Sequence, residues 1–83
     1  MKFDYRTQGV CSRSISFEIE DGLVKNVAFQ GGCNGNLKGI AALAEGKAPE
    51  EIIKTLSGIR CGFKSTSCPD QFARALENAL KNL

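Results

Sequence analysis

The chain has 83 residues, of which 42% are hydrophobic and 24% charged, so it forms one domain over residues 1–83 and is not a disordered chain. Its net charge of +2 is spread along the sequence and indicates neither a nucleic acid nor a membrane surface as partner. The sequence contains no histidine, so we expect no histidine-based catalysis. It contains no apolar run long enough to span a membrane and no apolar core of a signal peptide, so we expect a cytoplasmic protein.

The first third of the chain alternates between apolar and polar residues, as half-buried strands do. Two segments carry apolar or small residues at every second position: Phe3, Tyr5 and Thr7, then Ile15, Phe17 and Ile19. Asp21-Gly22 favours a two-residue hairpin turn. We expect Leu23, Val27 and Phe29 to share one face of the segment that follows. These patterns predict a three-stranded antiparallel sheet within residues 2–30, with one face exposed to water.

From Gly31 onward the apolar residues follow the period of helices. Asn34 or Asn36 can cap a first helix that Gly46 ends, and Pro49 suits the first turn of a second helix. The third helix runs from about residue 69 to 82. The three apolar faces are Leu37, Ile40, Ala41 and Ala44; Ile52, Ile53, Leu56 and Ile59; and Phe72, Ala73, Leu76, Ala79, Leu80 and Leu83. Strands followed by helices predict an α+β fold with the helices packed on one face of the sheet.

The main chemical signal is a set of four cysteines, Cys11, Cys33, Cys61 and Cys68. In a small domain of a reducing compartment, such a set indicates a metal site or redox chemistry more often than disulfides. No two of them stand in C-x-x-C spacing, so spacing alone is a weak signal. Each falls at the end of a predicted element, where side chains can be aimed at a common point. Inert buried thiols remain the alternative.

Residues beside the cysteines suit a thiolate site. Glycines allow backbone N–H groups to approach sulfur, and predicted helix N-termini at Cys33 and Cys68 favour the thiolate form. Either Cys68 or Ser67 is the N-cap of the last helix, because Pro69 follows Cys68 and Asp70 stands three residues after Ser67. The candidates for residues that support the ligands are Gly32, Asn34, Gly62, Ser67, Asp70 and Arg60.

The stretch Thr66-Ser67-Cys68-Pro69-Asp70 resembles the signature of the TSCPD domain family. Residues 31–36, 58–62 and 68–71 also look like the short bacterial members of that family, so the resemblance covers essentially the whole chain. It implies that Cys11, Cys33, Cys61 and Cys68 bind a metal ion. The family's domain also occurs at the C-terminus of adenosylcobalamin-dependent ribonucleotide reductases, which implies such a reductase, or another protein, as partner. A chain of 83 residues is too short to enclose a radical cofactor and a nucleotide pocket, so we expect an accessory module and not a stand-alone enzyme.

A second resemblance is to iron–sulfur scaffold proteins of the IscU type. Those proteins also have a hairpin sheet, then Gly-Cys entering a helix, as at Gly32-Cys33, then a cysteine opening a later helix, as at Cys68. The resemblance implies an IscU/SufE-like fold. The scaffold pattern has three cysteines, so the likeness carries over to function less well than to fold.

Two hypotheses from different classes follow. The first is a four-cysteine structural zinc site, whose closed shell of ligands leaves no position for a substrate. The second is an active role for sulfur, either as an iron–sulfur cluster scaffold or transfer module, or in thiol–disulfide exchange between Cys61 and Cys68. Cysteine ligands suit zinc, iron and copper(I) alike, so the sequence does not choose the metal.

Overall fold

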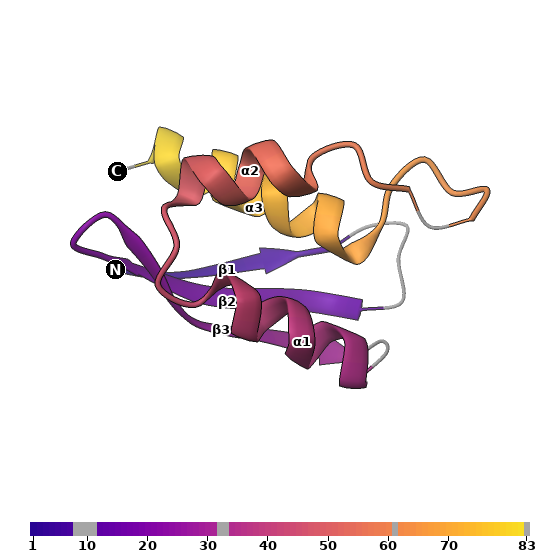
Figure 1. The fold of residues 1–83 in the computed structure, drawn as a ribbon, viewed down its shortest axis with the longest axis horizontal. Coiled ribbons are helices and arrows are strands. Elements are labelled where there is room, and N and C mark those ends of the chain that lie inside the picture. The colour runs from indigo at the N-terminus through magenta and orange to yellow at the C-terminus, as the bar shows by residue number, and fades with distance from the viewer. Residues whose placement is uncertain (8–11, 32–33, 61, 83) are drawn as a thin grey trace.

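The alternating segments of the first third form an antiparallel sheet, and the periodic segments after it form helices (Figure 1). The computed structural model describes residues 1–7, 12–31, 34–60 and 62–82. Its strands are β1 (Lys2–Arg6), β2 (Ser12–Glu20) and β3 (Leu23–Gly31), and its helices are α1 (Asn34–Ala44), α2 (Pro49–Leu56) and α3 (Cys68–Lys81). The sheet has the order β1-β2-β3. The predicted α+β arrangement is therefore confirmed. Within these described ranges, no helix is both long and apolar enough to cross a membrane.

The hairpin between β2 and β3 has the predicted two-residue turn. Glu20 pairs with Leu23, which leaves Asp21 and Gly22 as the loop. Both loop residues have positive φ angles, 53° and 76°, as a type I′ turn requires. Because this turn matches the twist of the flanking strands, it sets the pairing register at this end of the sheet.

A β-bulge in β3 corrects the prediction for the face that Leu23 occupies. Ser16 pairs with Ala28 and Glu18 pairs with Lys25, so β3 carries one residue more than β2 between these pairs. Asn26 lies in the bulge with a φ of 53°, and its backbone N–H donates to Glu45 Oε1 at 2.9 Å. The extra residue reverses the alternation, so that Val24, and not Leu23, is fully buried in the core against which Val27 and Phe29 pack.

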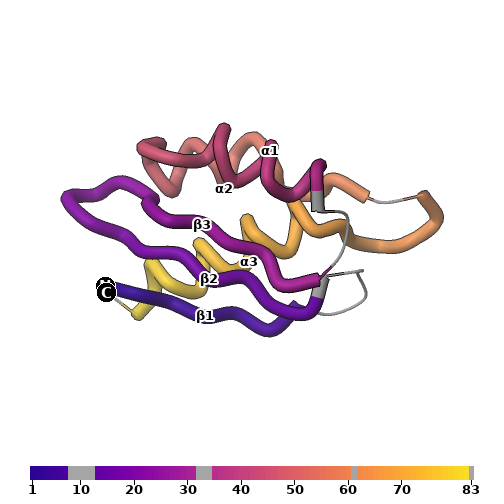
Figure 2. The backbone as a smooth tube through the Cα atoms, turned by 90° about the horizontal axis from the view of Figure 1, so that it is seen from below, coloured from indigo at the N-terminus to yellow at the C-terminus, as the bar shows by residue number. Residues whose placement is uncertain are grey.

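One hydrophobic core joins the sheet to the helices. Ile15, Phe17 and Ile19 of β2 face this core as predicted. The ring of Phe72 in α3 stands edge-on to Phe17 and Phe29, with centroids 5.8 and 5.7 Å away. In Figure 1, α2 and α3 lie over the sheet, and α1 runs beside β3, a placement that Figure 2 also shows. Ala44 of α1 and Ile52 of α2 complete the same core.

One apolar face is shorter than expected, and the structure defines two helix starts that the sequence left open. α2 ends at Leu56, so Ile59 lies beyond the helix and is 42% exposed instead of part of its apolar face. The chain turns away at Gly58, whose φ of 84° favours glycine. α1 begins at Asn34, which places Asn36 inside the helix. α3 begins at Cys68, with Ser67 as its N-cap, while Leu83 lies outside the described residues.

Candidate functional site

The chain segments that flank the four cysteines lie at one end of the domain. Because the strands are antiparallel, the end of β1, the start of β2 and the end of β3 share that end of the sheet. α1 and α3 begin there and α2 ends there, on the right-hand side of Figure 1. Cys68 is the first residue of α3 and is partly buried. Cys11, Cys33, Cys61 and Gly32 lie outside the described residues, and the remainder of the chain contains no group of three metal-ligating side chains.

The sheet brings the neighbours of Cys11 and Cys33 together. Ser12, which follows Cys11, is the pairing partner of Gly31, which stands two residues before Cys33. Thr7 follows β1, just before the segment that contains Cys11, and its backbone N–H donates to the Arg13 carbonyl of β2 at 3.1 Å. The described residues next to Cys11 and near Cys33 are therefore paired with each other in the sheet.

A side-chain hydrogen bond brings the neighbours of Cys61 and Cys68 together. The Ser67 hydroxyl donates to the Ile59 carbonyl at 2.6 Å and accepts the Asp70 backbone N–H at 3.2 Å. Ser67 directly precedes Cys68, and Ile59 stands two residues before Cys61. The N-cap of α3 thus also fastens the α2–α3 connection to the start of α3.

An aromatic contact connects the sheet near Cys33 to the helix that begins at Cys68. The ring centroids of Phe29 and Phe72 are 5.7 Å apart in an edge-to-face arrangement. Phe29 stands four residues before Cys33, and Phe72 stands four residues, about one helical turn, after Cys68. The described neighbours of the three connections that contain Cys11, Cys33 and Cys61, and the start of α3 with Cys68, are therefore joined through the same part of the core.

Asp70 is the centre of a buried polar network at this end of the domain. The residue is 3% exposed, and its Oδ1 accepts the Gly58 backbone N–H at 2.7 Å. Its Oδ2 accepts the Thr66 hydroxyl and pairs with Arg74 Nε at 3.1 Å. Gln71 Nε2 donates to the Thr66 oxygen at 3.0 Å. Both carboxylate oxygens are thus committed to holding the loop between α2 and α3.

This network gives structural roles to most of the Thr-Ser-Cys-Pro-Asp stretch. Thr66 and Asp70 hold the loop, Ser67 caps α3, and Pro69 occupies its first turn, where no N–H donor is needed. The sequence reasoning identified Ser67 and Asp70 but missed Gly58, Thr66 and Arg74. The i,i+4 spacing of Asp70 and Arg74 was a usable signal for the last of these.

The remaining candidate residues lie around the same end. Arg60 is exposed in the α2–α3 connection, and Gly62 is exposed with a φ of 58°, a conformation that favours glycine. Asn34 is the first residue of α1. These positions surround the connections that carry the cysteines.

The Asp70 carboxyl titrates below its ordinary range. Burial alone would raise its pKa, because burial disfavours the charged form. Hydrogen bonds from Thr66 and Gly58, together with the charge of Arg74, outweigh burial and hold the pKa below the ordinary aspartate value of 3.8. The ionised form is therefore the one that the folded state favours.

A specific acid sensitivity follows from this lowered pKa. The contribution of the Asp70 charge to stability should be present above the ordinary pKa of 3.8 and lost as the pH falls through the lower pKa of the folded state. We expect the difference in free energy of unfolding between wild type and Asp70→Asn to be largest near neutral pH and to shrink below about pH 4. Urea titrations at a series of pH values measure it. A difference that stays constant down to about pH 2.5 would contradict the assigned charge state.

Comparison with known proteins places the whole architecture in one family. No curated protein and no solved structure matches the chain. The family model described as the TSCPD domain matches residues 3–80, a span that includes all of the sheet except Lys2, the four cysteines and the Asp70 network. Since the match covers nearly the whole chain, the protein belongs to the TSCPD domain family.

Proposed function

We propose that this domain binds a structural zinc ion through Cys11, Cys33, Cys61 and Cys68. The supporting observation is that the neighbours of all four cysteines are joined at one end of the domain, by strand pairing, by the Ser67–Ile59 hydrogen bond and by the Phe29–Phe72 contact. Four thiolates complete the tetrahedral shell that zinc prefers. A closed shell has no open position for a substrate, so the ion stabilises the fold and does not catalyse a reaction.

The donor set suits this ion. Asp70 is not a competing ligand, because its two oxygens already accept hydrogen bonds from Gly58 and Thr66. Cys68 occupies the first position of α3, at the end of the domain where the described neighbours of the other three cysteines lie. Arg60 is exposed next to Cys61 in the sequence, where its charge would offset part of the net charge of −2 that four thiolates and Zn²⁺ carry together.

A site of this kind also suits a small domain. A chain of 83 residues buries a limited core, and the free energy of zinc binding adds directly to the free energy of folding. The domain would then serve as an accessory module beside a larger enzyme, as the resemblance to reductase-associated domains implies.

Metal analysis of protein purified under reducing conditions without a chelator tests the proposal. We expect about one zinc ion per chain, a colourless protein, and a visible thiolate–cobalt spectrum after exchange with cobalt(II). Each single Cys→Ser variant should lose the metal, whereas Ser65→Ala, an exposed neighbour in the same loop, should retain it. A coloured iron protein would favour the iron–sulfur alternative. A metal-free protein that forms a reversible Cys61–Cys68 disulfide would favour thiol exchange.

A further inference from the structure

The outer face of α1 lacks the charges of a solvated helix surface. Its 11 residues include one charged side chain, Lys38, with no acidic residue in the first turn and no basic residue in the last. Gly39, Ala42 and Leu43 are exposed, and Leu43 is 76% exposed. α3 differs, since it exposes the charged residues Arg74, Glu77 and Lys81. An outer face with a single charge, that of the exposed Lys38, and a protruding leucine is typical of an interface.

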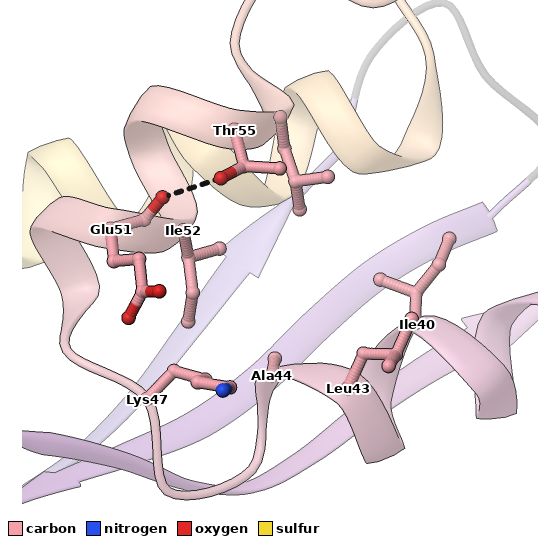
Figure 3. A pocket seen from close by; sticks show the side chains of 8 residues that line it. Ile40, Leu43, Ala44, Lys47, Glu51, Ile52 and Thr55 are labelled. Atoms are coloured by element: carbon pink, nitrogen blue, oxygen red, sulfur yellow. Dashed lines mark hydrogen bonds between the residues drawn. The ribbon is translucent and has the colours of Figure 1, made fainter.

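An apolar groove lies beside this face. It has a volume of about 270 Å³ between α1 and α2, and its walls include Ile40, Leu43 and Ala44 from α1 with Ile52 and Leu56 from α2. Figure 3 shows labelled side chains of the two helices facing one another across the open space. Leu43 stands at the edge of the groove. One patch thus has both a projecting leucine and a hollow that can receive an apolar side chain.

The same patch carries one charge of each sign. Lys47 and Glu51 both line the groove and are exposed (Figure 3). Neither takes part in the Asp70–Arg74 ion pair, which is the one formed within the part of the chain that the structure describes. A second patch with the same layout could therefore pair with both charges.

We propose that this α1–α2 groove binds a second copy of the chain across a two-fold axis. A two-fold interface joins one surface to itself, so the surface must carry both halves of every contact. This patch does so twice, because Leu43 can enter the partner's groove and Lys47 can meet the partner's Glu51. Gly39 and Ala42 allow close approach of the two α1 helices, since interaxial distance depends on side-chain size. A helix of an unrelated partner would need only the groove, and not the projecting Leu43 or the two opposite charges.

Sedimentation equilibrium over a range of protein concentrations tests this dimer. A reducing agent is included so that disulfides do not join the chains. We expect wild type to show a monomer–dimer equilibrium and Leu43→Asp to weaken the dimer by more than about tenfold, without a change in melting temperature beyond that caused by dissociation. Phe63→Asp is the matched control, because Phe63 is fully exposed and does not line the groove. It should leave the equilibrium unchanged.

Charge reversal tests the two-fold geometry itself. Lys47→Glu and Glu51→Lys should each weaken self-association, because each places like charges opposite one another. An equimolar mixture of the two variants should dimerise as well as wild type, since both charge pairs are then restored between unlike chains. The proposal is overturned by a wild type that stays monomeric, by a dimer indifferent to Leu43→Asp, by equal losses in Phe63→Asp, or by a mixture that does not recover. A monomer whose groove accepts a helix of another protein would also overturn it.

Discussion

Asp70→Ala is expected to lower the free energy of unfolding by about 2–4 kcal/mol. The substitution removes the acceptor for the Gly58 N–H and for the Thr66 hydroxyl. The Thr66 hydroxyl is buried, and a buried donor that loses its acceptor incurs the full cost of desolvation, which exceeds the net value of an ordinary hydrogen bond. Small domains have about 5–15 kcal/mol of stability in total, so this loss is a large fraction of it. Urea unfolding followed by circular dichroism measures the change.

Arg74→Ala is the matched control for the Asp70 network. Arg74 makes an ion pair with Asp70, but its side chain is 55% exposed, so solvent screens the interaction. Its removal should cost less than about 1 kcal/mol. A double-mutant cycle of Asp70→Ala with Thr66→Ala should show a coupling of about 1 kcal/mol or more, because the two side chains share a buried hydrogen bond. Equal effects of Asp70→Ala and Arg74→Ala would mean that the buried hydrogen bonds do not hold the loop.

If the proposed zinc site forms, Cys68→Ser is expected to remove the contribution of zinc binding to the folding energy, a loss of several kcal/mol. Serine has nearly the same size as cysteine, and the cap of α3 belongs to Ser67, so the substitution leaves the helix start intact. The loss should therefore report on the sulfur. Thermal melts with and without a chelator measure it. Wild type should lose stability on chelation, and Cys68→Ser should melt low in both conditions.

Ser67→Ala distinguishes the loss of the proposed metal ligand Cys68 from the loss of the helix cap beside it. It removes the N-cap and the hydrogen bond to the Ile59 carbonyl, and should cost about 0.5–2 kcal/mol. Its melt should still respond to chelation, because all four thiols remain. If wild type is indifferent to the chelator and Cys68→Ser melts normally, then the thiols do not stabilise the fold.

Local patterns in the sequence were sufficient for the kind and order of the elements. The period-two segments became β1 and β2, Asp21-Gly22 became the turn between β2 and β3, and the Ser67-to-Asp70 stretch became the start of α3. Each of these depends on neighbours within about four residues, and backbone propensities act over that range. The predicted position at the end of an element is confirmed for Cys68, at the start of α3, whereas the placement of the other three cysteines and the proposed convergence of all four stay predictions.

Contacts between distant segments decided the rest. The bulge at Asn26, which exchanged Leu23 for Val24 in the core, is held by Glu45, 19 residues away. Asp70 looked like part of a helix cap, but its carboxylate accepts the N–H of Gly58, 12 residues earlier. The groove between α1 and α2 exists because both helices pack on one core without closing over each other. Periodicity in the sequence shows which face of an element is apolar. Only the tertiary packing shows which backbone donor or side chain contacts that element, because the partner comes from another part of the chain.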